Sequence, residues 1–284
     1  MAGTTQAKRP RIAVVVPCYN DGATLPEAIE SIRAQEPCEL LVIDDGSTDS
    51  ATQRVFTELE REGVHVLHQE NAGLSAARMA GVHNTSAPYV FVLDADDRIE
   101  PGSLTALADA LDAQPSARAA WGDEQTFGRA EMLVSQERDL DPWLITYLNE
   151  WPATAMFRRE AILESGGWEL RGGYEDWDLW MTFAERGWTG VYVQTIVANY
   201  RLRSGRMLSD SKKRHGDIYA NLCRRHARLF AQRAVNRSRS TAPRRAKLLF
   251  PVIEALPFTP RNRHRLWSII LHPTRVLRQH FGIS

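Results

Sequence analysis

Four apolar segments in the first hundred residues constrain the fold most, because none of them alternates polar with apolar side chains. Between these segments, apolar residues recur at helical spacing. Strands without polar alternation that are separated by amphipathic helices are typical of a sheet that helices cover on both faces. We therefore predict an α/β fold with a mostly parallel, mixed sheet. The predicted strands are Ile12–Val16, Leu40–Ile43, Val64–Leu67 and Tyr89–Leu93.

The first helical stretch shows the pattern most clearly. Leu25, Ile29 and Ile32 fall on one helical face, and Thr24 with Glu27 has the spacing of a capping box. A capping box would start this helix by satisfying free backbone N–H groups. Further helices are predicted around Val55–Leu59, over Leu74–His83, and from Pro101 through Leu104, Leu107 and Leu111.

The remaining chain is less regular. Short strands are predicted at Ala119–Trp121 and Ala153–Phe157, a helix at Glu175–Arg186, a strand at Val191–Arg201, and basic helices from Ser209 onward. We expect a polar N-terminal tail (residues 1–10), a main domain (11–210) and a basic helical C-terminal extension (211–284). The polar strand ends place the expected ligand site in the first half of the main domain, residues 11–115. Residues 116–210 form the second half.

Charge is distributed unevenly, although the whole chain has 35 basic and 35 acidic residues. Residues 1–200 contain 15 Lys and Arg against 32 Asp and Glu, whereas residues 201–284 contain 20 against three. A basic extension of this kind either meets an anionic surface, such as a membrane, or docks on the acidic body of its own chain. No nucleic-acid partner is expected, since no nucleic-acid-binding module is recognisable.

Three scattered cysteines, Cys18, Cys38 and Cys223, fit neither a zinc site nor a disulfide framework. The N-terminal residues lack an apolar signal segment, and no apolar run reaches the roughly 18 residues of a membrane span. We therefore expect a cytoplasmic protein, with peripheral contact at the inner face of the membrane as the alternative.

Polar side chains follow each of the four predicted strands. Ligands of parallel sheets bind beyond the carboxyl ends of the strands, so these clusters predict a binding site. The clusters are Pro17–Asn20, Asp44–Asp49, Glu70–Ser75 with Arg78 behind it, and Asp94–Asp97.

Asp94 and Asp96 are suited to a hard divalent cation, because Mg²⁺ and Mn²⁺ prefer carboxylate and phosphate oxygens. The alternative is a loop whose aspartates cap the helix after Pro101. Asp44 and Asp45 either accept hydrogen bonds from a base or ribose or form a turn that caps the next helix.

The role of each of the next residues has two alternative interpretations. Tyr19 either stacks on a flat base or packs at an edge. Arg78 either reaches a diphosphate or is a solvated helical arginine. The arginines that follow the last predicted strand, Arg201, Arg203 and Arg206, either bind a diphosphate or begin the basic tail.

Glu175 and Asp176 stand where a glycine-rich loop becomes a helix. Carboxylates stabilise the N-terminus of a helix, which is one explanation for them. The other is a general base that removes a proton from an attacking hydroxyl.

Six of these segments occur in a fixed order: Val14–Asn20, Val42–Asp49, Asn71–Arg78, Leu93–Asp97, Gly166–Trp168 and Glu175–Trp180. In this order and spacing the chain resembles the family 2 glycosyltransferases with the Rossmann-like glycosyltransferase-A fold, over roughly residues 10–210. The resemblance implies an inverting transfer from a nucleotide-diphosphate sugar to a sugar, lipid-linked or other hydroxyl acceptor, in cell-surface polysaccharide, glycolipid or glycoconjugate synthesis. It also implies a nucleotide-sugar-binding half (11–115) and an acceptor-binding half (116–210).

The resemblance also implies roles for individual residues. Asp176 would be the catalytic base, with Glu175 beside it. Asp94 and Asp96 would bind Mn²⁺ or Mg²⁺. The residues implied to bind the nucleotide sugar are Pro17, Tyr19, Asn20, Asp44, Asp45, Arg78, Asp94, Ala95, Asp96 and Arg201.

One position departs from the pattern. Many relatives have a histidine two residues after the position of Arg201, whereas this chain has Arg203. The departure argues against a third protein ligand to the metal and suggests that arginine neutralises the phosphates instead. It also motivates a second hypothesis, a catalytically inactive nucleotide-sugar-binding or scaffold protein.

Overall fold

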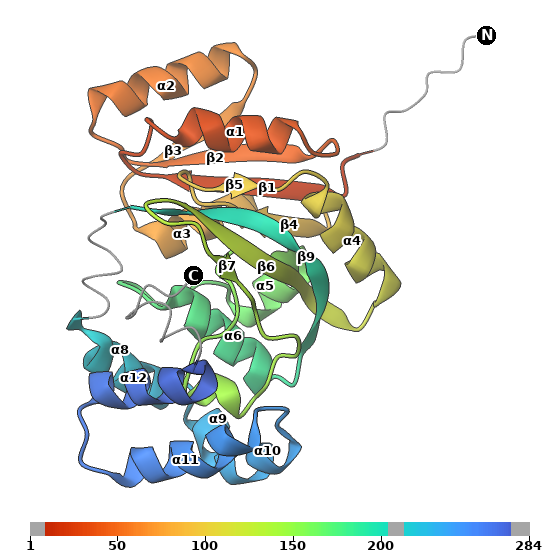
Figure 1. The fold of residues 1–284 in the computed structure, drawn as a ribbon. Helices are drawn as coiled ribbons and strands as arrows, with labels where there is room; N and C mark the ends of the chain where they lie inside the picture. Colours follow the sequence, from red (N-terminus) through yellow and green to blue (C-terminus); the bar gives the residue numbers. More distant parts are fainter. Residues whose placement is uncertain (1–8, 204–212, 274–284) are drawn as a thin grey trace. The chain divides into compact units, whose positions relative to one another are not determined.

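The computed structural model describes residues 9–203 and 213–273, which belong to two compact units (Figure 1). The sheet unit comprises Met1–Arg138, Pro152–Arg171 and Thr189–Arg203, and the helical unit comprises Asp139–Trp151, Gly172–Trp188 and Ser204–Ser284. The units interleave along the chain, whereas the predicted domains follow one another. The functional division into nucleotide-sugar-binding and acceptor-binding halves stays a prediction.

The sheet unit contains a nine-stranded sheet in the order β3-β2-β1-β4-β8-β6-β9-β5, with β7 paired to β6. The four strands predicted in the first hundred residues are present and pair in parallel. The prediction of an α/β fold with a mixed sheet flanked by helices is therefore confirmed. These strands are β1 (Ile12–Cys18), β2 (Glu39–Asp45), β3 (His65–Gln69) and β4 (Tyr89–Val92).

The second part of the sheet is mixed. Strand β8 is antiparallel to both β4 and β6, and β9 is parallel to β6 with several register shifts. Strand β6 extends well beyond the predicted Ala119–Trp121, because its pairing with the long β9 continues through the register shifts. These strands are β5 (Arg98–Ile99), β6 (Ala117–Gly128), β7 (Leu133–Val134), β8 (Met156–Arg158) and β9 (Thr189–Leu202).

Helices cover both faces of the parallel strands, as the absence of polar alternation predicted (Figure 1). Val14 packs in one apolar core with Ile29 of α1 and Leu107 of α4. Val15 points to the opposite face, where α3 approaches so closely that a Cβ at Gly81 would lie 2.1 Å from Val15 Cγ1. The helices are α1 (Leu25–Arg33), α2 (Ser50–Arg61), α3 (Leu74–His83), α4 (Ser103–Ala113) and α5 (Arg159–Ser165).

The predicted capping box at the start of α1 is wrong. Thr24 occupies the N-cap position, but its side chain makes no capping hydrogen bond. Its hydroxyl donates instead to the carbonyl oxygen of Asp21, at 3.3 Å. Glu27 pairs with Arg98 and Arg201 rather than with the N-cap backbone. Ion pairing with two arginines outweighs a local backbone contact here.

The helical unit is built around aromatic side chains. The ring of Trp143 stacks on that of Phe250 at 5.7 Å, and Tyr147 meets Trp267 edge to face at 5.0 Å. Phe250 and Trp267 belong to the basic extension, so this extension docks on residues 139–151 of its own chain. The predicted helix start at Ser209 lies outside the described residues. The elements are η1 (Leu144–Thr146), α6 (Glu175–Glu185), α8 (His215–Arg225), α9 (Ala227–Ala231), α10 (Arg233–Arg239), α11 (Arg244–Ala255) and α12 (Pro260–Leu271).

Among the helices in residues 9–203 and 213–273, none combines the length and apolar character that crossing a bilayer requires.

Candidate functional site

The ends of β1 and β2 are joined through Asn20. Its backbone has a positive φ of 55°, and its side-chain Oδ1 accepts hydrogen bonds from the N–H groups of Thr48 and Asp49, both at 2.8 Å. Tyr19 beside it is 49% exposed, whereas Pro17 is buried. Tyr19 thus has an exposed ring at the predicted nucleotide edge, while Asn20 holds two loops together.

Asp44 and Asp45 are both buried. Asp45 accepts hydrogen bonds from the N–H groups of Ala72 and Gly73, each at 2.9 Å, and so fixes the loop after β3. Burial alone would raise the pKa of Asp44, but its hydrogen bonds with His68 and the Ser47 N–H lower it below the usual range.

Neither aspartate caps the next helix, because Asp49 caps α2 through the N–H of Thr52 at 2.9 Å. Asp44 and Asp45 therefore hold the loops at this edge. Their predicted contact with the nucleotide stays a prediction.

Arg78 is 2% exposed, which excludes the interpretation as a solvated helical arginine. Its Nη2 lies 2.9 Å from Oδ1 of Asp94, and its guanidinium lies 5.7 Å from the centre of the Trp168 ring. Trp168 belongs to the Gly-Gly-Trp segment of the predicted pattern, so the structure brings three of the six segments together here.

The loop after β4 does not cap α4, because Gly102 is the N-cap residue and no side chain caps this helix. Asp97 points inward and accepts the backbone N–H of Arg201 at 2.7 Å. Burial, together with the negative charges of Asp94 and Asp96, raises the pKa of Asp97 to about 9. The capping alternative fails, and Ala95 is buried between the two outward-facing aspartates.

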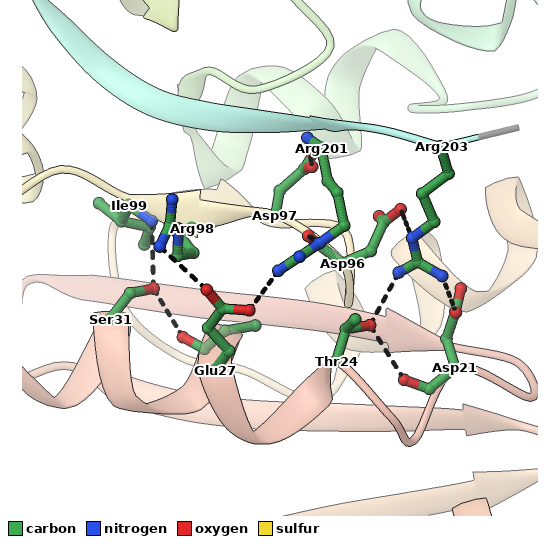
Figure 2. Close-up of polar contacts among 11 residues, drawn as sticks. Asp21, Thr24, Glu27, Ser31, Asp96, Asp97, Arg98, Ile99, Arg201 and Arg203 are labelled. Atoms are coloured by element: carbon green, nitrogen blue, oxygen red, sulfur yellow. Dashed lines mark hydrogen bonds and ion pairs between the residues drawn. The ribbon is translucent and has the colours of Figure 1, made fainter. Parts of the chain in front are cut away.

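Asp96 is bound by an arginine. Nε of Arg203 lies 3.1 Å from Oδ2 of Asp96, as Figure 2 shows. Arg201, on β9, donates from Nε to the backbone oxygen of Asp96 at 2.8 Å and pairs with Glu27. Two arginines, one at the end of β9 and one directly after it, thus hold the Asp-Ala-Asp loop.

A divalent cation does not fit these residues as they stand. Asp94 and Asp96 offer the carboxylate oxygens that Mn²⁺ and Mg²⁺ prefer. Each of them, however, is already paired with an arginine, Arg78 or Arg203. In the part of the chain that the structure describes, no group of three or more His, Cys, Asp or Glu side chains is arranged to hold a metal ion. The metal assignment to Asp94 and Asp96 stays a prediction.

Glu175 and Asp176 begin α6 in the helical unit. Tyr174 before them is the N-cap residue with a positive φ of 63°, which turns the chain sharply into the helix. Nδ2 of Asn149 donates to Oδ2 of Asp176 at 2.8 Å and fixes the orientation of this carboxylate. Asp176 is half-buried, as a general base with access to a ligand should be.

Asp178, two residues further along α6, has a different environment. It is 1% exposed and accepts hydrogen bonds from Nε and Nη2 of Arg225, at 2.7 and 3.0 Å. Nε2 of His226 lies 3.0 Å from the same carboxylate. Asp178 therefore anchors the basic extension to α6 within the helical unit.

Sequence reasoning missed Asp21, Thr24 and Asn149. Asp21 directly follows the polar end of the first predicted strand, so its position at the ligand edge was a usable signal. Thr24 was assigned to the capping box. Asn149 had no signal, since 27 residues separate it from Asp176.

Comparison with known proteins agrees with the predicted pattern. The family model described as Glycosyl transferase family 2 matches residues 13–166. The glycosyltransferase GlyA of Streptococcus pneumoniae is 42% identical over 32% of this chain and 13% of its own length. The chain spans between 13% and 33% of the length of the first five curated relatives that it matches.

Two solved structures share the fold at low sequence identity. Residues 1–349 of Staphylococcus aureus TarS, in complex with UDP-GlcNAc, match with a TM-score of 0.58 and 17% identity over 96% of this chain and 73% of that one. The mannosyltransferase PcManGT of Pyrobaculum calidifontis, in complex with GDP-Man and Mn²⁺, matches with a TM-score of 0.58 and 17% identity over 96% of this chain and 88% of that one.

Proposed function

Because the chain belongs to glycosyl transferase family 2, we propose that it transfers a sugar from a nucleotide-diphosphate sugar to an acceptor hydroxyl, with inversion at the anomeric carbon. The observation that carries the proposal is the paired cluster at the end of β4. There Asp94, held by the buried Arg78, and Asp96 supply carboxylates for ribose hydroxyls, and Arg203 beside Asp96 supplies a guanidinium group for phosphates. The nucleotide sugars bound to TarS and PcManGT support the same class of donor.

The proposed reaction is a single displacement. Asp176 accepts the proton of the acceptor hydroxyl, whose oxygen attacks the anomeric carbon of the sugar while the bond to the nucleoside diphosphate breaks. Asn149 positions the base, and Glu175 contacts the acceptor or the donor sugar. Tyr19 stacks on the base of the nucleotide, and Arg78 positions Asp94.

The proposed reaction does not depend on a step at a divalent cation. The expectation of metal dependence draws support from the Mn²⁺ in the PcManGT complex. When bound, a divalent cation offsets negative charge on a leaving diphosphate. Because Asp94 and Asp96 are already paired with arginines, no step proposed for this chain passes through a metal.

A panel of nucleotide sugars tests the proposal. The panel includes UDP-GlcNAc and GDP-mannose, and binding is measured by calorimetry with Mn²⁺ and with EDTA. Release of nucleoside diphosphate is then followed with hydroxyl acceptors. Failure to bind any nucleotide diphosphate under either condition would exclude the proposed function. Binding without transfer, even to sugar and lipid-linked acceptors, would favour the inactive binding or scaffold protein instead.

We further propose that the basic extension contacts an anionic membrane at the inner face, where a lipid-linked acceptor would be located. Leu248, Leu249 and Val252 on α11 are 63%, 43% and 54% exposed. Arg244 and Lys247 lie on the same helix. Apolar side chains rimmed by basic ones are suited to an anionic lipid surface. The free cysteines agree with a reducing compartment.

Liposome sedimentation tests the membrane contact. A double variant, Leu248→Ser with Val252→Ser, should sediment less with anionic vesicles than the original protein, and neither should sediment with neutral vesicles. The exposed side chains are changed because deleting α11 and α12 would also remove Phe250 and Trp267 from the aromatic core. Equal sedimentation of both proteins would contradict this contact.

A further inference from the structure

Arg203 is held by three oxygens from two other segments of the sheet unit, as Figure 2 shows. Nη1 donates to Oδ1 of Asp21 at 2.7 Å, and Nη2 donates to Oγ1 of Thr24 at 2.8 Å. Nε lies 3.1 Å from Oδ2 of Asp96. Asp21 and Thr24 come from the connection between β1 and α1, whereas Asp96 follows β4. The guanidinium therefore bridges two of the polar strand ends.

Arg201, which was predicted to bind the diphosphate, makes other contacts than Arg203. Its side chain is 19% exposed, lies over the ring of Phe127 at 4.3 Å, and contacts Glu27 and the backbone of Asp96. The side chain of Arg203 is 35% exposed. Arg201 thus holds the loop in place, while Arg203 is the arginine that a ligand can reach.

The guanidinium of Arg203 has more N–H groups than these three contacts use. A guanidinium carries five N–H groups, and the contacts with Asp21, Thr24 and Asp96 use three of them. Among the contacts within residues 9–203 and 213–273, one N–H on each Nη of Arg203 has no acceptor. Two N–H groups on one planar group are suited to two phosphate oxygens.

The carboxylates that contact these arginines all have a cationic partner. Asp21 and Asp96 are paired with Arg203, while Glu27 is paired with Arg98 and Arg201. A divalent cation is normally required where carboxylates alone would repel a diphosphate. A diphosphate that approaches Arg203 therefore meets carboxylates that are each already paired with a guanidinium group.

We propose that Arg203 supplies the positive charge that meets the diphosphate of the donor beside Asp96, so that a nucleoside diphosphate binds without a divalent cation. The inference rests on the proposed function and concerns the same site. It assigns to Arg203 a contact with the ligand and to Arg201 the positioning of the loop.

Calorimetry with UDP and GDP, using the full-length protein in EDTA and in Mn²⁺, tests the inference. In the original protein, the affinity for the better nucleotide should change by less than about threefold between the two conditions. In Arg203→Gln, which removes the charge, the affinity in EDTA should fall by about tenfold or more. Arg203→His should bind weakly in EDTA and recover with Mn²⁺, because an imidazole beside Asp96 can serve as a metal ligand.

A matched control is available in the same unit. Arg33→Gln removes an arginine of similar exposure that pairs with Glu30 and Glu62, outside the network. It should bind nucleotide as the original protein does. Melting temperatures confirm that each variant is folded, and Arg203→Lys, which keeps the charge, should retain binding in EDTA better than Arg203→Gln.

The outcomes separate the inference from the function. If the original protein binds nucleotide about tenfold or more tightly with Mn²⁺ than in EDTA, the inference is wrong while the proposed function stands. Equal affinity of Arg203→Gln and the original protein in EDTA also overturns it. Absence of nucleotide binding under both conditions overturns the inference together with the proposed function.

Discussion

The two acidic clusters of the molecule, after β4 in the sheet unit and at the start of α6 in the helical unit, look alike in sequence but differ in their partners. Each contains one buried aspartate. Burial and the negative charges of Asp94 and Asp96 raise the pKa of Asp97 to about 9, although the backbone N–H of Arg201 acts in the opposite direction. Asp178 is equally buried, yet hydrogen bonds from His226 and Arg225 outweigh burial and lower its pKa. The partner group, rather than the depth of burial, decides the charge of a buried carboxyl.

The half-buried members of the clusters differ in the same way. Asp96 contacts a guanidinium, that of Arg203, whereas Asp176 accepts a hydrogen bond from the neutral amide of Asn149. A carboxylate beside an arginine is suited to binding an anionic ligand through that arginine. A carboxylate oriented by an amide is suited to accepting a proton. These different partners agree with the different roles that we propose for Asp96 and Asp176.

The largest effect is expected for Asp176→Asn. If Asp176 is the base, transfer should slow by about 10²- to 10⁴-fold, because proton removal from the acceptor is lost. Steady-state rates with the donor found in the panel measure this, and calorimetry should show unchanged donor binding. Asp217→Asn, an exposed change in the same unit, should leave the rate unaltered. Full activity of Asp176→Asn would remove Asp176 from the mechanism.

Asp178→Ala should instead act on stability. The change leaves Arg225 and His226 without the carboxylate that both contact, and removing one partner of a buried ion pair costs about 3–5 kcal/mol of unfolding free energy. Urea unfolding followed by circular dichroism measures this loss. A loss below about 1 kcal/mol would mean that Asp178 does not anchor the extension.

The same pair predicts a dependence on pH. The pKa of Asp178 is lowered in the folded state, so its contribution to stability is full above the unfolded pKa near 4 and is lost as the pH falls through the lowered folded value. Between about pH 5 and 3, the original protein should therefore lose more stability than Asp178→Asn, by up to about 1.4 kcal/mol per pH unit. Parallel pH profiles of the two proteins would contradict this assignment.

The smallest effect is expected for Glu27→Gln. Glu27 pairs with Arg98 and Arg201, but its side chain is 42% exposed, so water screens both ion pairs. The unfolding free energy should change by about 0.2–1 kcal/mol. Urea unfolding measures this change beside Asp178→Ala, and a loss as large as that of the buried aspartate would show that exposure does not weaken the ion pairs of Glu27.

Much of the sheet unit could be predicted because its signals are local. An apolar run without polar alternation has to be buried on both faces, and the polar residues that end it have to lie at one edge of a parallel sheet. The pairing of Arg78 with Asp94, by contrast, depends on how α3 packs against the sheet. The error at Thr24 and Glu27 has the same origin, since their arginine partners lie on β5, on β9 and directly after β9.

The sequence by itself determined the α/β fold, the four polar strand ends and the family, because these follow from the order of short segments. Only the tertiary structure decided that Arg203 lies on Asp96, that Asn149 holds Asp176, and that Asp178 anchors the extension. Each of these contacts joins residues at least 27 positions apart, and hydrogen bonds and ion pairs act over a few ångströms. Packing therefore decides which charged groups come into contact, and a local sequence pattern cannot predict these contacts.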